Sequence, residues 1–447
     1  RDLCGIEDSP DKLFADWTDH KRGDARYNDR DLVRKHADES VATLQFLLDN
    51  GVTFIDKPIV TPDASSVPRV FVTHEWHIKE EIIAPHRNRN GSGLVRRLAE
   101  SARKKGAQIL CSHEMTRIVR DDGKGRVRGI VVRHGGKDVA IEAKKGVVIA
   151  TGGHTGNVQF RRMFDPRLTE EYQQAGMPWT EQGADGELAA MDIGASLWAA
   201  ATQTQEVGPA ITKTKHIGNR WGYISLVYET DSPIFDRAKA TGLTVTDWQE
   251  CILVNQFGKR FWNELDSGYE FINAAMQNHG DGDKLNGGGP IWAIFDSDAA
   301  ARQKWNCKPP NVDPDGWFFT ADTVFELAGK IRNPHQKKPM DGAQLQETVN
   351  RYNWFVAMGT DIDFGKQTPL HPIAKPPFYA AWSTPILHDT LTGLRTDTNA
   401  QVMDTRGEVI QGLYCAGESQ GGFAQHELGR CLVFGRVAGR HAAQRNS

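Results

Sequence analysis

Apolar residues recur at helical spacing in two segments near the start of the chain. The first segment, 29–49, has apolar side chains at intervals of four, four, three and four, which places them on one helix face: Val33, Ala37, Val41, Leu44 and Leu48. Asn50-Gly51 supplies a left-handed stop after it. A second helix is predicted to follow Ser92 and to end at Gly106.

Short strands are predicted to follow these helices. Turns rich in glycine separate three of them: 108–119, 126–134 and 138–143. The next run, 146–151, is mostly apolar and predicts a strand buried on both faces, as in parallel sheets. A β-meander that leads back into a parallel sheet indicates an α/β fold.

The pattern changes between residues 204 and 372. Tryptophan, proline, glycine and charged residues are dispersed there, helices are predicted over 321–331 and 342–358, and no strand pattern dominates. We interpret this stretch as a second, α+β domain inserted into the first.

Strand character returns at 401–404 and 409–416, and a helix is predicted over 428–443. That helix is rich in small residues, which would let it lie close to a sheet or a ligand: Gly429, Gly435, Ala438, Gly439 and Ala442.

Composition narrows the function classes. The 447 residues are 39% hydrophobic and 25% charged, the balance of a globular protein. The net charge of -3 gives no reason to expect a nucleic-acid partner. No apolar run reaches the ~20 residues that a membrane span needs. We expect a cytoplasmic protein without membrane insertion; a removed signal segment is the alternative.

The chain offers no metal or disulfide pattern. Its six cysteines are scattered without a C-x-x-C pair. His74-Glu-Trp-His77 lacks the i, i+4 histidine spacing of a zinc-binding helix, so we expect a structural or solvent-facing pair and no metal.

The first motif with chemical content is Ala150-Thr151-Gly152-Gly153, directly after the apolar run. Glycines at the carboxyl end of a parallel strand let backbone approach a ligand closely, because no Cβ intervenes. A tight turn without a ligand is the alternative.

The second motif is a strand that ends in Ala416-Gly417-Glu418, then Gly421-Gly422, then the small-residue helix near Gly429. An acidic residue at a strand end suits a cofactor hydroxyl. The amino end of the helix suits negative charge, such as that of a reduced flavin. A purely structural strand–turn–helix is again the alternative.

Together with Gly183-Ala-Asp-Gly186, Val254-Asn-Gln-Phe-Gly-Lys-Arg-Phe-Trp-Asn-Glu264 and Pro376-Pro-Phe-Tyr379, these motifs resemble the fumarate reductase/succinate dehydrogenase flavoprotein family. That family includes 3-ketosteroid dehydrogenases. The resemblance runs in consistent order over nearly the whole chain.

The resemblance implies a glutathione-reductase-type, Rossmann-like FAD-binding domain, split in sequence, with an inserted α+β capping domain. The expected parts are 1–204 and 375–447 for the FAD-binding domain and 205–374 for the cap. The implied FAD-binding residues are Met115, Ala150, Thr151, Gly152, Gly153, Asp185, Gly417, Glu418, Gly429, Arg430, Leu432 and Val433.

One part of the family pattern is missing. Relatives begin with a strand, a G-x-G-x-x-G turn and a helix that hold the FAD pyrophosphate. No such motif stands in these residues. We expect the given sequence to lack that amino-terminal unit; a genuine loss would predict weak or absent FAD.

The substrate-binding pattern of fumarate reductases is also absent. Leu265 follows Asn263-Glu264 where an Arg is expected, and His388-Asp389-Thr390 replaces His-His-Thr. Glu427 stands where a carboxylate-binding Arg would lie, and it would repel a dicarboxylate. We therefore expect fumarate to be a poor substrate.

The 3-ketosteroid dehydrogenases use tyrosines at two places, after the Asn-Glu pair and in the last loop, where this chain has Tyr269 and His426. The Tyr-Pro-Gly-x-Gly loop of those enzymes is absent from this chain. Either side chain can exchange a proton with a carbon beside a carbonyl. We expect His426 or Tyr269 to transfer the proton, with His388, Asp389 and Glu427 tuning or binding. The alternatives are a core role for Tyr269 and a surface position for His426.

The leading hypothesis is an FAD-dependent oxidoreductase that moves hydride between flavin N5 and a carbon–carbon bond beside a carbonyl of a small organic substrate. The alternatives are a cofactor-poor subunit that keeps the fold for assembly, and an electron-transfer subunit with a protein partner. A homo-oligomer is compatible with each of these hypotheses.

Overall fold

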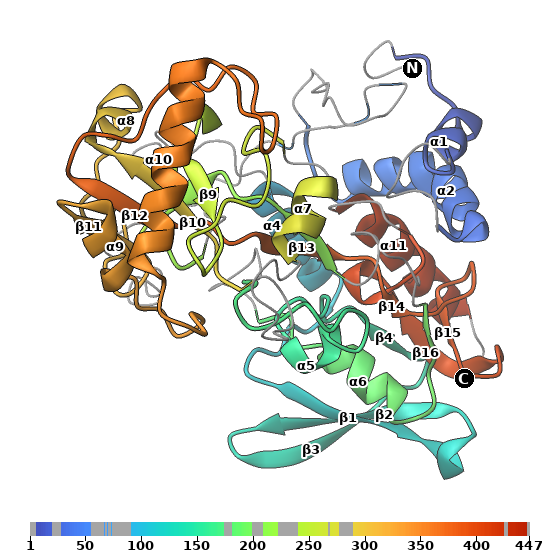
Figure 1. The fold of residues 1–447 in the computed structure, drawn as a ribbon. Coiled ribbons are helices and arrows are strands. Elements are labelled where there is room, and N and C mark those ends of the chain that lie inside the picture. Colours follow the sequence, from blue (N-terminus) through green and yellow to red (C-terminus); the bar gives the residue numbers. More distant parts are fainter. Residues whose placement is uncertain are drawn as a thin grey trace. The chain divides into compact units, whose positions relative to one another are not determined.

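The computed structural model describes residues 6–19, 28–54, 67, 69, 73, 91–173, 181–198, 209–221, 240–266, 269–276, 289–423 and 428–444. The chain forms two compact units, whose elements Figure 1 labels. Unit 1 comprises Arg1–Gly153, Ala184–Ala200 and Asp389–Ser447, and unit 2 comprises His154–Gly183 and Ala201–His388. Within the described ranges, no helix is long and apolar enough to cross a bilayer.

The central sheet of unit 1 has the order β15-β16-β4. β16 (Val409–Cys415) pairs with β4 (Val147–Ile149) in parallel and with β15 (Gln401–Met403) in antiparallel orientation. The predicted parallel strand is confirmed, but its burial on both faces is wrong. Val148 is 41% exposed, and of the three residues of β4 only Ile149 is buried.

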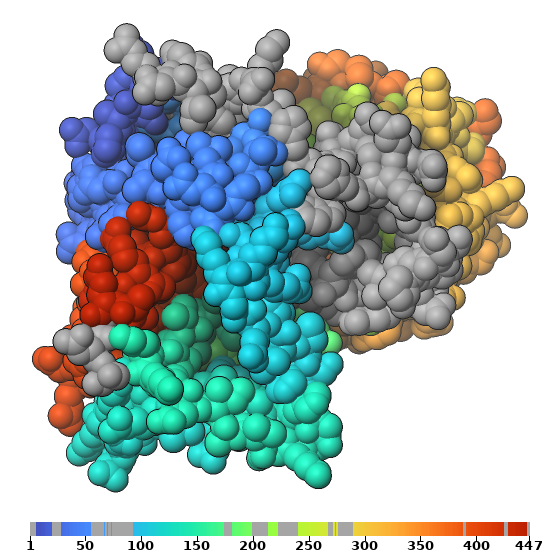
Figure 2. Space-filling model, turned by 180° about the vertical axis from the view of Figure 1, so that it is seen from behind, coloured from blue at the N-terminus to red at the C-terminus, as the bar shows by residue number. Residues whose placement is uncertain are grey.

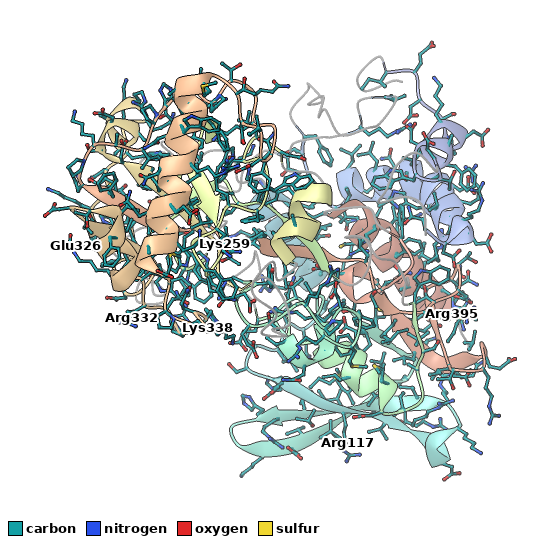
Figure 3. The ribbon with its side chains drawn as sticks, in the orientation of Figure 1. Arg117, Lys259, Glu326, Arg332, Lys338 and Arg395 are labelled. Atoms are coloured by element: carbon teal, nitrogen blue, oxygen red, sulfur yellow. The ribbon has the colours of Figure 1, made fainter. Side chains whose placement is uncertain are left out.

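The predicted meander lies beside this sheet. β1 (Glu114–Arg120), β2 (Val127–His134) and β3 (Lys137–Glu142) are antiparallel, and β1 begins later than expected. The inward residues Ile118 and Val127 share a buried cluster with Ile149 and Leu413. Arg117 on β1 is exposed, as Figure 3 shows, and every residue of β3 is exposed, including the apolar Val139 and Ile141. Strands β1 and β2 therefore bury one face against the central sheet, whereas β3 does not.

Helices α2 (Arg30–Asp49) and α11 (Leu428–Gln444) pack on each other in unit 1, as Figure 2 shows in blue and red. Leu32 and Val33 share a buried cluster with Phe434 and Val437. Glu39 accepts hydrogen bonds from Arg436 and Arg440, which lower the pKa of its carboxyl to about 2, with Arg440 contributing most.

The predicted inner face of α2 is only partly right. Val33 and Ala37 are buried, but Val41 is 72% exposed. The buried stripe instead runs through His36 and Thr43, two polar residues that a hydrophobic pattern leaves out.

The small residues of α11 have differing surroundings. A Cβ added at Gly435 or Gly439 would meet none of the described atoms within 4 Å, so these two glycines adjoin no sheet there, and a close approach to a ligand stays a prediction. Ala438 and Ala442 are buried as expected.

Shorter elements complete unit 1. They are α1 (Pro10–Asp16), α4 (Gly91–Lys104), α6 (Asp185–Met191) and the antiparallel pair β5 (Leu197–Trp198) and β14 (Gly393–Leu394). Leu94 of α4 is buried as predicted.

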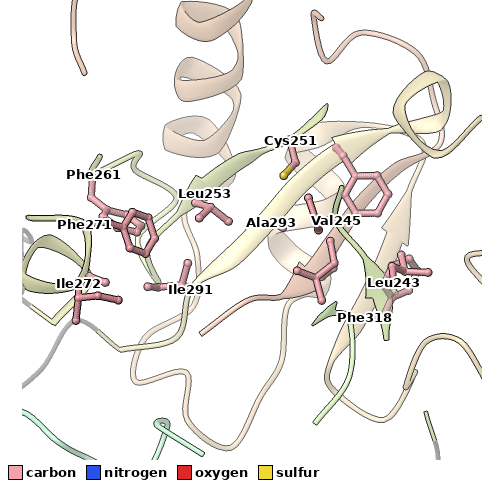
Figure 4. Packing of buried hydrophobic residues seen from close by; sticks show 14 of the residues in the cluster. Leu243, Val245, Cys251, Leu253, Phe261, Phe271, Ile272, Ile291, Ala293 and Phe318 are labelled. Carbon is pink, nitrogen blue, oxygen red and sulfur yellow. The ribbon is translucent and has the colours of Figure 1, made fainter. Parts of the chain in front are cut away.

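Unit 2 is built on an antiparallel sheet of order β11-β12-β10-β9. Its strands are β9 (Ile252–Val254), β10 (Trp292–Asp296), β11 (Phe318–Ala321) and β12 (Phe378–Trp382). The sequence pattern failed to reveal this sheet, because every residue of β9 and β10 is buried and no alternation marks them. Figure 4 shows one of the two apolar clusters that flank it.

Helices and short strands surround this sheet. Helix α10 (Gly342–Met358) has the predicted bounds, and α9 (Val324–Lys330) lies inside the predicted range. The others are α5 (Val158–Arg161), β6 (Pro209–Thr212), β7 (His216–Ile217), β8 (Leu243–Thr244), α7 (Tyr269–Met276), α8 (Ser297–Arg302) and β13 (Ile386–Thr390).

Candidate functional site

Two loops of unit 1 meet where β4 and β16 end. Because these strands are parallel, both loops leave the sheet at the same edge. The Ala416 N–H donates to the Ile149 carbonyl at 2.9 Å. The Ser419 hydroxyl donates to the Gly152 carbonyl and lies 3.2 Å from the Thr151 hydroxyl. The two predicted cofactor loops therefore form one site.

Glycine is required in these loops for two physical reasons. Gly152 has φ +85° and Gly417 has φ +78°, in the left-handed region that side chains other than glycine rarely adopt. At Gly153 the reason is space, since a Cβ there would lie 2.3 Å from the Thr390 hydroxyl oxygen. Glycine at these three positions therefore allows the β4 and β16 loops to lie close to each other.

A third segment joins the site through the start of α6. The Gly186 N–H donates to the Thr151 hydroxyl at 3.2 Å, and a Cβ at Gly186 would lie 2.3 Å from Ile149 Cγ2. Gly186, the second glycine of the motif Gly183-Ala-Asp-Gly186, therefore packs directly against the β4 loop, where a side chain would not fit. Asp185 is exposed beside it.

The start of α11 is tied to the same loops. The buried Arg430 donates to the carbonyls of Phe423 and Thr390 at 2.6 and 2.8 Å. The Thr390 hydroxyl in turn donates to the Glu418 carbonyl at 2.9 Å. These contacts connect the helix that carries Gly429 to the loop after β16. The Arg430 guanidinium is thus hydrogen-bonded to backbone carbonyls, and its contact with a cofactor stays a prediction.

The remaining predicted cofactor residues have apolar surroundings in unit 1. Val433 is buried in the cluster shared by α2 and α11, and Leu432 packs against the cluster of Leu47 and Leu94. Met115 packs against the cluster below the β4 and β16 loops. Their roles in cofactor binding stay predictions.

Sequence reasoning missed Glu187, the residue after the Gly183–Gly186 motif. It is 0% exposed, and neither carboxyl oxygen accepts a hydrogen bond from another residue in the described part of the chain. Burial raises the pKa of its carboxyl to about 8, and the negative charges of Glu418 and Asp185 add to this. A charged residue beside a glycine motif was the only signal in the sequence.

The predicted proton-transfer residues are not brought together by the described structure. His426 and Glu427 lie outside the described residues, as do His74 and His77. Tyr269 is the first residue of α7, and His388 and Asp389 lie in β13; the structure describes only the backbone there. Their catalytic roles stay predictions.

The segment that ends in Asn263-Glu264 has a structural role in unit 2. The fully buried Glu264 accepts two hydrogen bonds of 2.8 Å from Arg260 and lies 3.3 Å from Lys366 Nζ. Arg260 also donates to Asp361 at 2.9 Å. Burial raises the pKa of Glu264, but the charges of Lys366 and Arg260 outweigh it and lower the value to about 2.

Comparison with known proteins identifies the family. The sequence pattern of the family described as "FAD binding domain" matches residues 2–429. The chain belongs to this FAD binding domain family. The predicted family and its cofactor, FAD, are thereby confirmed.

Curated relatives are named as oxidoreductases or reductases of acrylate, fumarate and urocanate. The chain is 28% identical over 434 residues to the NADH:acrylate oxidoreductase of Vibrio harveyi, covering 94% of this chain and 38% of that protein. It is 27% identical to a fumarate reductase (cytochrome) of Shewanella frigidimarina, covering 98% and 67%. It is also 27% identical to the urocanate reductase of Eggerthella lenta, covering 98% and 65%. The chain thus spans between about two fifths and two thirds of these relatives.

Solved structures show the same fold. An open conformation of a flavocytochrome c3 fumarate reductase has a TM-score of 0.65 at 24% identity, covering 98% of this chain and 68% of that one. A 3-ketosteroid Δ1-dehydrogenase from Sterolibacterium denitrificans also has a TM-score of 0.65, at 22% identity, covering 99% and 90%. The predicted α/β flavoprotein fold is confirmed.

The residues of unit 1 fit part of FAD. The β4 and β16 loops leave the sheet at one edge, where Gly152 and Gly417 present backbone without a Cβ and Glu418 supplies a carboxylate acceptor. Such a set suits the hydroxyl-bearing chain of the cofactor. The pyrophosphate-binding G-x-G-x-x-G motif of the family does not occur in these 447 residues.

Proposed function

We propose that this protein is an FAD-dependent oxidoreductase that transfers hydride between the flavin and a carbon–carbon bond beside a carbonyl of a small organic substrate. The observation that carries the proposal is the meeting of the β4 and β16 loops, joined by the Ser419 and Thr151 contacts. The relatives support it, because acrylate, fumarate and urocanate all carry a double bond next to a carboxyl group.

Different residues of unit 1 have different roles in FAD binding in this proposal. When bound, FAD supplies the atom that accepts or gives the hydride. The Gly152 and Gly417 loops allow its close approach, and Glu418 and Asp185 offer acceptors to its hydroxyl groups. Arg430 keeps the start of α11 against Thr390, so the amino end of that helix holds its position relative to the loop.

His426 or Tyr269 exchanges the proton with the substrate carbon in this proposal, and His388, Asp389 and Glu427 tune or bind. The carbonyl beside the reacting bond stabilises the negative charge that develops on that carbon. Fumarate is expected to be a poor substrate, because Glu427 would repel one of its two carboxylates. A cytoplasmic location belongs to the same proposal.

The test begins with the visible spectrum of the purified protein after addition of FAD and removal of the excess. A retained flavin band is expected. Anaerobic reduction of acrylate, urocanate, 2-cyclohexenone and fumarate is then followed by oxidation of reduced viologen. Turnover of a substrate with one carbonyl group, and much slower turnover of fumarate, would support the proposal.

Two outcomes would contradict it. A protein that retains no flavin after reconstitution would favour the cofactor-poor subunit. A protein that retains flavin but oxidises viologen with none of the four compounds would favour the electron-transfer subunit. Heat-denatured protein with free FAD is the control for non-enzymatic reduction.

A further inference from the structure

A loop of unit 2, residues 331–339, lines an open pocket of about 390 Å³ and directly follows helix α9. Sites for small molecules measure roughly 300–1,000 Å³, so this pocket has the size for a compact ligand. Three cationic side chains are among those that line it: Arg332, Lys337 and Lys338. Figure 3 labels Arg332 and Lys338 on the same side of unit 2. The whole pocket lies within unit 2, so its geometry does not depend on unit 1.

The chain around this pocket is basic. Residues 327–340 include four Lys or Arg residues and no Asp or Glu. Lys330 is engaged elsewhere, since its Nζ donates to the Thr320 carbonyl at 2.9 Å. Neither the Arg332 guanidinium nor the Lys337 ammonium has a hydrogen bond or an ion pair with another residue that the structure describes, and both side chains are exposed. At least two cations of the pocket can therefore bind a ligand.

Side-chain hydrogen bonds hold the backbone of this loop in place. The Gln336 amide donates to the Gln256 carbonyl at 2.7 Å and accepts from the indole N–H of the buried Trp292 at 3.2 Å. The Asn333 amide donates to the Gly316 carbonyl at 2.8 Å. Because the backbone is fixed before a ligand binds, less conformational entropy is lost on binding. The loop is therefore a preorganised support for its cationic side chains.

The kind of ligand follows from these charges. Arginine offers N–H donors in a planar fork that matches phosphate oxygens, and lysine binds phosphate as a point charge. A phosphate monoester carries about 1.5–2 negative charges at pH 7, more than the single charge of a carboxylate. Several cations around one small pocket therefore favour a ligand with phosphate groups over a monocarboxylate.

We propose that the pocket at residues 331–339 binds a small molecule that carries a diphosphate group, with Arg332, Lys337 and Lys338 as its charged contacts. The proposal goes beyond the proposed function, because it assigns a second ligand site, in unit 2. It does not require FAD or turnover.

Glu170 is an acidic group that opposes such a ligand. It also belongs to unit 2, and the charge of Lys337 acts on it and on Glu171. Glu171 is 1% exposed, and burial raises the pKa of its carboxyl, whereas Glu170 is exposed. No salt bridge joins Glu170 to Lys337 in the described ranges, so the lysine stays available. Removal of the charge of Glu170 should therefore strengthen the binding of an anion.

Isothermal titration calorimetry with inorganic pyrophosphate tests the proposal at pH 7 and low ionic strength. The protein is first reconstituted with FAD and freed of the excess. Wild type is expected to bind one pyrophosphate in this pocket. Arg332→Gln and Lys337→Gln should each raise the dissociation constant about tenfold, the worth of one charge-assisted hydrogen bond. Glu170→Gln should lower it about two- to threefold, in the opposite direction.

The matched control is Lys308→Gln. Lys308 is an exposed lysine of unit 2 that does not line the pocket. Its substitution changes the net charge by the same amount as Lys337→Gln, so it should leave the dissociation constant of pyrophosphate unchanged.

ADP and adenosine distinguish the sources of the diphosphate group. Tighter binding of ADP than of pyrophosphate, weakened by Arg332→Gln, would assign a nucleotide. Equal or weaker binding of ADP would assign a ligand that is recognised through its phosphates alone. Adenosine lacks phosphate and should not bind; binding of adenosine that depends on Arg332 would contradict the proposal.

Two results with pyrophosphate would overturn the proposal. One is the absence of binding to wild type at concentrations up to about 10 mM. The other is an equal dissociation constant in wild type, Arg332→Gln and Lys337→Gln, with folding of the variants verified by circular dichroism. Since neither measurement depends on flavin reduction, such a failure would leave the proposed function standing.

Discussion

Substitution of Glu264 by Gln isolates the charge at the centre of unit 2. The carboxylate accepts two hydrogen bonds of 2.8 Å from Arg260 and lies 3.3 Å from Lys366 Nζ. Gln has nearly the same shape but no charge. After the change, Arg260 retains its bond to Asp361, whereas Lys366 keeps only the carbonyls of Trp248 and Cys251. One buried cation is then left without a carboxylate.

The size of the effect follows from the pKa of Glu264. Its value falls from 4.5 to about 2, although burial alone would raise it, because Lys366 and Arg260 hold the charged form. A depression of this size corresponds to roughly 3 kcal/mol. Removal of one partner of a buried ion pair costs about 3–5 kcal/mol by independent measurements. We therefore expect Glu264→Gln to lower the free energy of unfolding by about 3–5 kcal/mol at pH 7.

The pH dependence has a defined sign. Because the folded pKa is depressed, the contribution is fully present above the unfolded value of 4.5 and is lost as the pH falls toward 2. The difference between wild type and Glu264→Gln should therefore be constant from pH 6 to 8 and shrink under acid conditions.

Urea denaturation followed by tryptophan fluorescence measures the effect, since the buried Trp292 and Trp382 lie in the unit 2 core. The matched control is Glu347→Gln on the exposed side of α10, which should change the free energy of unfolding by less than about 0.5 kcal/mol. A loss below about 1 kcal/mol for Glu264→Gln would refute the assignment of a paired, charged carboxylate.

Four further predictions concern unit 1 and the proposed chemistry. In the FAD-free protein, the folded state keeps a proton on Glu187 between pH 4.5 and about 8, whereas the unfolded state loses it. This carboxyl therefore makes the free energy of unfolding fall by about 1.4 kcal/mol per pH unit in that range. Denaturation at pH 5.5 and 7.5 should show that Glu187→Gln removes this slope, and an equal pH dependence in wild type and variant would contradict the prediction. Gly417→Ala, at φ +78°, should lower the free energy of unfolding by about 1–2 kcal/mol and reduce flavin content, measured by thermal melting and by absorbance. Glu418→Ala should lower flavin retention in the ratio of visible to ultraviolet absorbance, and unchanged content would exclude its predicted contact. His426→Ala should slow flavin reduction in stopped-flow experiments without loss of flavin, and normal rates would remove His426 from the mechanism.

The site-forming part of the fold could be predicted from the sequence because its signals are local. The apolar run before Thr151 and the glycines after it indicate a parallel strand and a loop. The same reasoning applies to the strand before Gly417. Parallel pairing then places both loops at one edge, which the structure confirms. The placement of the two loops depends on backbone pairing and not on side-chain contacts, so it could be predicted without knowing how the side chains pack.

Predictions that depended on burial were less successful. Val41 and Val148 are apolar but exposed, while His36 and Glu187 are polar but buried. Each case depends on what covers that position in space, and hydrophobic spacing along one element cannot supply this. The β9 and β10 strands of unit 2 were missed for the related reason that uniform burial removes the alternation.

The gathering of carboxyl groups at this site limits which part of FAD it can hold. The charges of Glu418 and Asp185 act on the buried Glu187. A pyrophosphate carries negative charge, and like charges repel at short range, so these carboxyl groups would oppose its binding. Hydroxyl groups are neutral and accept or donate as the carboxyls require. Burial raises the pKa of Glu187 to about 8, so the negative charges that remain near neutral pH are those of Asp185 and Glu418. The phosphates are therefore expected to be bound by residues other than these three, and Glu418→Gln should change the affinity for the hydroxyl-bearing chain without affecting the salt dependence that phosphate contacts impose.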